Sequence, residues 1–167
     1  MTLDEINSLP SDAFVEAFGG IYEHSPWVAG AAVSARPYDD VDHMLAVMDE
    51  IVAQAPEASR LALLRAHPEL AGKAAIDGTL TDASQEEQAS AGLDRLLPDE
   101  FEHLTKLNTA YQDKFGFPFI ICVKLATKAV ILTALEERLG HKYQAEFETA
   151  LGEVSKIVRL RLEGMIS

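Results

Sequence analysis

Apolar residues recur at helical spacing along most of the chain. Between Asp40 and Gln54 they form a single stripe that comprises Val41, Met44, Leu45, Met48, Ile51 and Val52. This spacing of three and four residues is typical of one face of an amphipathic helix. The same spacing, together with capping residues and prolines, predicts helices over residues 3–9, 12–18, 40–54, 56–66, 84–97, 98–115, 127–139 and 143–165, and another that begins at residue 26, after Ser25 as its cap.

Two stretches depart from this pattern. Residues 69–83 contain two glycines and little periodicity. We therefore expect a loop there, and long loops in compact domains are often functional. Residues 118–123 (PFIICV) have the composition of a strand, but no other segment offers them a partner strand. We expect them to be buried and irregular, or to start the next helix, and buried irregular backbone has main-chain groups to offer a ligand.

The pattern as a whole predicts an all-α protein. We expect a single-domain helical bundle over residues 1–167, with one buried irregular apolar segment near 118–123. The length of 167 residues and the apolar fraction of 48% are enough for one domain with a full core. No repeat or linker-like stretch divides the chain.

The charge and the cysteine content narrow the function. Acidic residues number 27 against 14 basic ones, and the resulting net charge of -13 disfavours nucleic acid and membrane surfaces as partners. The one cysteine, Cys122, cannot form an internal disulfide, and the chain has no metal-binding motif such as His-Glu-x-x-His, so we expect no metal. The chain shows no signal-peptide pattern, no peroxisomal tripeptide and no transmembrane stretch, so we expect a cytoplasmic protein.

Two candidate catalytic residues flank the 69–83 loop. His67 precedes Pro68, which disfavours helical backbone at the histidine, so the preceding helix must end there. A histidine in this position can transfer protons at neutral pH, or it can cap the last carbonyl groups of the helix. Glu87 also leaves two alternatives open. Ser84 and Glu87 are spaced as a capping box, but the same helix start can bind an anionic or carbonyl-rich ligand.

Arg161 interrupts an apolar seam in the last predicted helix. The seam comprises Phe147, Leu151, Val154, Val158 and Met165. A buried arginine needs an anionic partner, because removing its charge from water is costly. That partner is either a buried carboxylate of the protein or an anionic group of a ligand, which the planar guanidinium can bind with two hydrogen bonds. Cys122 lies in the most apolar run of the chain, where burial disfavours the thiolate, so we exclude it as a nucleophile.

Several short motifs together resemble one family. They are Phe18–Trp27 (FGGIYEHSPW), His67–Gly72 (HPELAG), Ser84–Gln88 (SQEEQ), Asn108-x-x-Tyr111, Lys114–Phe119 (KFGFPF) and Leu160–Leu162 (LRL). In this order they resemble 2-oxo-4-hydroxy-4-carboxy-5-ureidoimidazoline (OHCU) decarboxylases. The resemblance extends from the first predicted helix to the last.

This resemblance implies a cofactor-free, all-helical decarboxylase, usually a homodimer, which converts OHCU to (S)-allantoin and CO2 in urate degradation. It implies that His67 is the proton donor, that Glu87 orients the substrate and that Arg161 holds it. It also implies substrate contacts from Pro68, Ser84, Gln85, Glu86, Glu87, Gln88, Phe119, Ile120, Ile121, Cys122, Val123 and Arg161.

Two other functions compete with this one. In a non-catalytic helical interaction module, Glu87 is only a cap, Arg161 is paired with a buried acid, and the loop after His67 binds a protein. A helical hydrolase of ureido compounds acts on a related substrate by a different reaction. The products distinguish the three, because a hydrolase releases ammonia and an interaction module accelerates no reaction.

Overall fold

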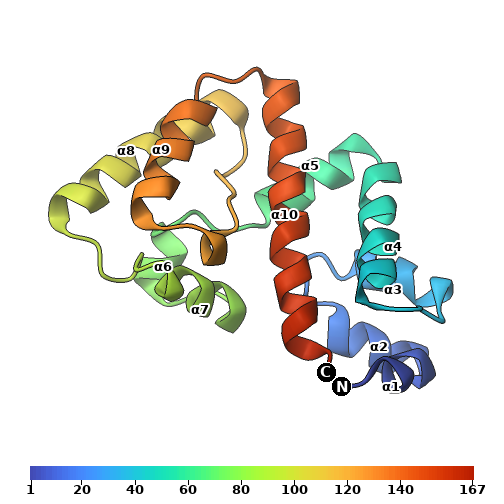
Figure 1. Ribbon diagram of the computed structural model, residues 1–167. Helices are drawn as coiled ribbons and strands as arrows, with labels where there is room; N and C mark the ends of the chain where they lie inside the picture. The colour runs from blue at the N-terminus through green and yellow to red at the C-terminus, as the bar shows by residue number, and fades with distance from the viewer. The chain divides into compact units, whose positions relative to one another are not determined.

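The computed structural model describes residues 1–167, and its regular structure is entirely helical (Figure 1). The α-helices are α1 (Leu3–Ser8), α2 (Ser11–Phe18), α3 (Trp27–Ala32), α4 (Val41–Gln54), α5 (Glu57–Arg65), α6 (Lys73–Asp77), α7 (Asp82–Ser90), α8 (Pro98–Phe115), α9 (Lys128–Arg138) and α10 (Tyr143–Met165). Two short 3₁₀ helices, η1 (Val33–Ala35) and η2 (Val123–Leu125), complete the set. The predicted all-α class is confirmed.

The chain divides into two compact units. Unit 1 comprises residues 1–66 and 155–167, and unit 2 comprises residues 67–154. Helix α10 contributes its first half to unit 2 and its second half to unit 1. The single domain expected from the length of the chain stays a prediction.

Unit 1 has its core along α4. Asp40 caps this helix by accepting a hydrogen bond from the main-chain amide of His43 at 2.7 Å. The predicted stripe of α4 supplies the fully buried Met44 and Met48, and α4 packs against α3. The two ends of the chain meet in this unit, because the amino group of Met1 donates to the carbonyl of Met165 at 3.1 Å.

Unit 2 is organised around α8, which packs against α9. The buried face of α8 presents Leu104, Asn108, Tyr111 and Phe115 at helical spacing. The helix ends as predicted after Phe115, because Gly116 adopts a left-handed conformation with φ of 75° that only glycine accepts without strain. A polar residue, Asn108, thus occupies a buried position in an otherwise apolar face.

The region between α5 and α8 differs from the prediction in three ways. The expected loop over residues 69–83 contains a short helix, α6. Helix α7 begins at Asp82, with Thr81 as its capping residue, and not at Ser84. It also ends at Ser90 and not near Leu97, because Gly92 turns into the left-handed region with φ of 77°.

Residues 117–123 are all buried, and residues 118–122 belong to neither a helix nor a strand. The segment continues into η2 and then into α9, whose N-terminus Thr127 caps by accepting from the amide of Val130. The prediction of a buried irregular apolar segment near 118–123 is therefore confirmed. No helix of the protein is long and apolar enough to cross a bilayer.

Candidate functional site

His67 lies at the start of unit 2, immediately after α5. That helix ends at Arg65, as expected from the proline at position 68. The histidine side chain is removed from water, with 7% of the residue exposed. Its backbone begins the turn His67–Gly72, which leads into α6.

Two amide side chains fix the turn that follows His67. The Gln88 side chain accepts from the amide of Ala71 at 2.9 Å and donates to the carbonyl of Glu69 at 3.3 Å. Asn108 donates to the carbonyl of Leu70 at 2.9 Å. Ala71 has a positive φ of 50°, a strained conformation for a residue with a Cβ, and its hydrogen bond to Gln88 offsets part of that cost.

The tight turn also depends on Gly72. A Cβ at this position would lie 2.7 Å from the Cβ of Glu69, closer than carbon atoms approach. The turn therefore needs glycine for close packing, since its φ of −84° is open to any residue. His67 is thus presented on a backbone that α7 and α8 hold from two sides.

The inner face of α7 presents Ser84, Glu87 and Gln88, all of which are buried. The outer face carries Gln85 and Glu86, and Glu86 forms a surface ion pair of 3.9 Å with Lys124. Because the side-chain oxygen of Thr81 accepts from the amide of Ser84, Ser84 lies in the first turn of the helix. The predicted capping box of Ser84 and Glu87 is therefore wrong, because Thr81 and not Ser84 caps α7.

The irregular segment lies next to α7. Helix α7 contacts η2, so the start of α7 and the Phe119–Val123 segment are neighbours in unit 2. The main-chain amides of Phe119, Ile120 and Ile121 pair with no main-chain carbonyl, although all three residues are buried. Buried N–H groups need hydrogen-bond acceptors, so the main chain of this segment can donate hydrogen bonds to a polar ligand.

Arg161 belongs to unit 1, where it has a protein partner. One guanidinium nitrogen lies 2.9 Å from the carboxylate of Glu23, and another donates to the carbonyl of Ile21 at 3.1 Å. Glu23 is only 2% exposed. Of the two partners left open by the sequence, the buried carboxylate of the protein is therefore present.

A cavity of about 480 Å³ in unit 2 lies on another side of α7. It is lined mainly by small and apolar side chains of α6, α7 and the start of α8, with Gln85 and Gln88 on its wall. His67, Ser84 and Glu87 are not among its lining residues. Of the polar candidates on α7, only Gln85 and Gln88 thus line this cavity.

Most of the predicted site residues belong to the same compact unit. His67, Pro68, the Ser84–Gln88 helix start and Phe119–Val123 all belong to unit 2, whereas Arg161 belongs to unit 1. No group of three or more histidine, cysteine or acidic side chains is arranged to hold a metal ion. Buried polar side chains beside irregular main chain are typical of a site for a small polar molecule.

Sequence reasoning missed Glu23 and the role of Asn108. Both lie within motifs that carry the family resemblance, but nothing in the sequence indicates that Glu23 is the partner of Arg161. Asn108 had one usable signal, because it falls on the same helix face as Leu104, Tyr111 and Phe115. A polar residue in an apolar stripe is a candidate for a buried hydrogen bond.

Comparison with known proteins gives the family. A sequence model described as OHCU decarboxylase matches residues 7–163. The chain therefore belongs to the OHCU decarboxylase family. A relative from Haloferax volcanii, named 2-oxo-4-hydroxy-4-carboxy-5-ureidoimidazoline decarboxylase, is 46% identical over 97% of this chain and 94% of its own length.

Longer relatives and solved structures agree with this assignment. A uric acid degradation bifunctional protein from Bacillus sp. is 41% identical over 98% of this chain, which spans only 32% of that protein. The crystal structure of an (S)-allantoin synthase superposes with a TM-score of 0.79 at 36% identity, covering 99% of this chain and 54% of the other. A crystal structure of OHCU decarboxylase in the presence of (S)-allantoin gives a TM-score of 0.72 at 25% identity, covering 90% of this chain and 96% of the other.

Proposed function

We propose that this protein converts OHCU to (S)-allantoin and CO2 as a step of urate degradation. The observation that carries the proposal is the match of residues 7–163 to the OHCU decarboxylase family. The buried polar groups of unit 2 support it, because His67, Ser84 and Glu87 are withdrawn from water and α7 adjoins a backbone with amides to give. The surface ion pairs of the protein offer no comparable site.

The reaction needs an electron sink and a proton. When the bond to the carboxylate breaks, its electron pair moves into the adjoining C=N of the ring, and CO2 leaves. The ring nitrogen that receives the electron pair takes up a proton, which leaves an enol. The enol hydroxyl then loses its proton and becomes a carbonyl, while a proton adds to one face of the neighbouring carbon and fixes the configuration of the product. Because the electron sink lies within the substrate, we propose that the reaction requires neither a cofactor nor a metal.

The proposal gives each polar group a role. His67 delivers the proton, an effect typically worth about 10² to 10⁴-fold in rate. Glu87 orients His67 or binds the ureido N–H groups, and Arg161 holds the anionic or hydroxyl groups of the substrate. Main-chain groups from the start of α7 and from Phe119–Val123 bind the amide edges of the heterocycle, and Pro68 contributes a contact beside His67.

We further propose that the protein is a cytoplasmic homodimer. The homodimeric state is what the resemblance to OHCU decarboxylases implies. Sedimentation of the purified protein measures the oligomeric state directly, and a single species with the mass of one 18.2 kDa chain would contradict it.

The decisive test uses OHCU generated enzymatically from urate. We expect the purified protein to accelerate the disappearance of OHCU and to give one enantiomer of allantoin, observed by circular dichroism. Racemic allantoin formed at the spontaneous rate would contradict the proposal and favour the interaction module. Release of ammonia would instead favour a hydrolase of ureido compounds.

The role of Arg161 has its own test. We expect Arg161→Ala to weaken the binding of anionic substrate analogues far more than that of neutral ones, because only the anionic compounds lose a charged partner. Isothermal titration with matched pairs of analogues measures the difference. An equal loss for both classes would show that the pair with Glu23 is purely structural.

A further inference from the structure

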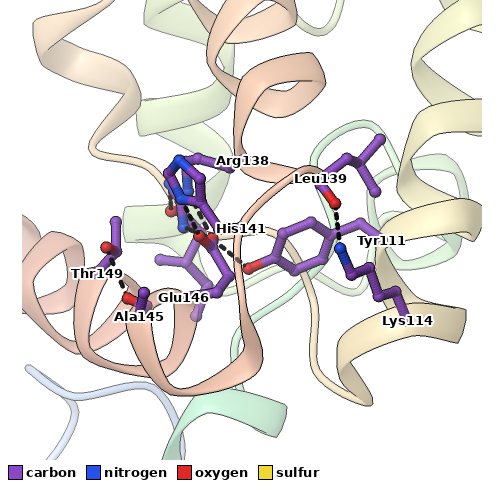
Figure 2. A network of polar contacts seen from close by, with 9 residues as sticks. Tyr111, Lys114, Arg138, Leu139, His141, Ala145, Glu146 and Thr149 are labelled. Atoms are coloured by element: carbon purple, nitrogen blue, oxygen red, sulfur yellow. Dashed lines mark hydrogen bonds and ion pairs between the residues drawn. The ribbon is translucent and has the colours of Figure 1, made fainter.

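A buried polar cluster in unit 2 takes no part in the chemistry proposed above (Figure 2). It joins Arg138 at the end of α9, Glu146 in the first turn of α10 and Tyr111 in α8. Oε1 of Glu146 accepts from the Tyr111 hydroxyl at 2.5 Å and from Nε of Arg138 at 2.6 Å. Glu146 is completely buried, and the half-exposed His141 lies 3.2 Å from its other oxygen.

Arg138 also contacts the irregular segment. Its Nη1 donates to the carbonyl of Ile120 at 2.7 Å, and its guanidinium carbon lies 4.4 Å from the centroid of the Phe119 ring. The Tyr111 ring packs edge-on against the same phenylalanine, with centroids 5.4 Å apart. The cluster therefore holds two successive residues of the segment that the proposed function assigns to the substrate.

The hydrogen bond to Ile120 fixes the direction of the next amide. In a trans peptide the carbonyl and the following N–H point to opposite sides, and the Ile120–Ile121 peptide is trans. Since the Ile120 carbonyl points toward Arg138, the Ile121 N–H points away from it. That N–H is one of the buried amides with no main-chain acceptor.

A purely stabilising role does not account for this arrangement. Replacing a buried ion pair with apolar side chains of similar volume is often neutral or even stabilising, because the two charges lose their hydration on burial. The planar guanidinium presents its donors in fixed directions, so one edge can bind a carboxylate while another donor binds a carbonyl. An apolar residue has no donors, and the compact ammonium of lysine does not reproduce this geometry. The distinguishing feature of Arg138 is thus its bond to the backbone.

We propose that Arg138, held by Glu146 and Tyr111, is a positioning residue that orients the Ile121 amide to donate a hydrogen bond to a carbonyl of the substrate heterocycle. The inference rests on the proposed function. Arg138 itself points to the other side of the peptide and does not touch the substrate. Its effect is therefore on substrate binding and not on proton transfer.

The main test replaces the whole ion pair. The double variant Arg138→Met, Glu146→Leu leaves no unpaired buried charge, although the Tyr111 hydroxyl loses its acceptor. We therefore expect the protein to remain folded, with a modest fall in the midpoint of thermal unfolding. We expect KM for OHCU to rise about 10- to 100-fold, because the bound substrate loses a well-aligned hydrogen bond, while kcat falls less than about threefold. Titration with (S)-allantoin measures the same loss of affinity without turnover.

Arg138→Lys provides a second variant in case the double variant does not fold. Lysine retains the charge opposite Glu146, but its single ammonium group lacks the fork that also reaches Ile120, so KM should rise while the protein stays folded. The matched control is His141→Ala, which removes another partner of Glu146 and leaves the Arg138–Ile120 bond in place. We expect its KM to equal that of the unmodified protein.

Two results overturn the inference. One is a crystal structure of either Arg138 variant in which the Ile120–Ile121 peptide keeps its direction, and the other is a KM that is unchanged in a folded variant. Failure of the proposed function looks different, because the unmodified protein would then not turn over OHCU at all, and both proposals would fall together.

Discussion

At the scale of single residues, His67 is the group on which the proposed reaction depends most. Its side chain is buried on a turn that Gln88 and Asn108 hold, and α5 ends before it. The hydrogen bonds of Gln88 and Asn108 fix the main chain that follows the histidine. Proton transfer is fastest when the donor is already in the correct position, because no further ordering is needed after the substrate binds.

We expect His67→Asn to lower kcat by about 10² to 10⁴-fold, since the amide cannot donate a proton at neutral pH. The thermal midpoint should change little, because the turn is held by other residues. His103→Asn is the matched control, as His103 is half-exposed on α8 and pairs with Glu136 at 2.9 Å. A large loss of stability with activity retained would assign His67 to capping.

Asn108 gives the second residue-scale prediction. Asn108→Asp keeps the shape of the side chain but replaces the donor to Leu70 with a carboxylate, which cannot donate and would face a carbonyl oxygen. We expect a loss of about 1–3 kcal/mol in the free energy of unfolding at neutral pH, measured with urea. Gln112→Glu, an equivalent change at an exposed position of α8, should stay within about 0.5 kcal/mol.

At the scale of elements, helical periodicity predicted most helices and their ends. Helix α4 begins after Asp40, α8 spans Pro98–Phe115 and α10 spans Tyr143–Met165, all as expected. These elements combine strong amphipathic stripes with clear capping residues or breakers, so local sequence decides their bounds. The irregular 118–123 segment was predictable for a different reason, since a strand without a partner cannot satisfy its backbone.

The elements that sequence misplaced are those fixed by tertiary contacts. Residues 69–83 lack periodicity, yet they contain α6, a helix of five residues with no buried residue. For α7, the sequence pattern predicted Ser84 as the cap, whereas Thr81 has this role in the folded backbone. The partner of Arg161 was equally out of reach, because Glu23 lies 138 residues away in the chain.

The packing of Tyr111 on α8 predicts how stability depends on pH. Burial and the neighbouring Glu146 raise the pKa of Tyr111 well above its usual value near 10. Above about pH 10 the unfolded chain releases this proton and the folded protein retains it, so unfolding becomes more favourable as the pH rises. Below pH 10 the hydroxyl is protonated in both states and contributes no pH dependence.

We expect the free energy of unfolding to fall by up to about 1.4 kcal/mol per pH unit above pH 10 for each such tyrosine. Burial raises the pKa of Tyr38 to about 12, so it adds to the same decline between about pH 10 and 12. In Tyr111→Phe the slope in this range should be smaller, as measured by urea unfolding at a series of pH values. An unchanged slope would mean that Tyr111 titrates alike in both states.

At the scale of the whole molecule, the excess of acidic residues is the dominant feature. The net charge is -13 on 167 residues, so folding brings many negative charges closer together. Their mutual repulsion destabilises the compact state. Salt screens that repulsion, because the Debye length falls to about 8 Å at physiological ionic strength.

We therefore expect the thermal midpoint to rise when NaCl is increased from about 10 mM to about 150 mM, a change that shortens the Debye length roughly threefold or more. Scanning calorimetry at fixed pH measures the shift. Potassium chloride should give the same result, since the effect depends on ionic strength and not on a bound ion. A midpoint that falls with salt would show that attractive ion pairs outweigh the repulsion.

The meeting of the two chain ends in unit 1 has a practical consequence. Met1 donates to Met165, and the amide of Ser167 donates back to the carbonyl of Met1 at 3.0 Å. A few glycines and serines are then enough to close the polypeptide into a ring without distorting either end. New ends opened at the exposed residues Gly78 and Thr79 give a circular permutant in which His67 and Glu87 lie near opposite ends of the rearranged chain.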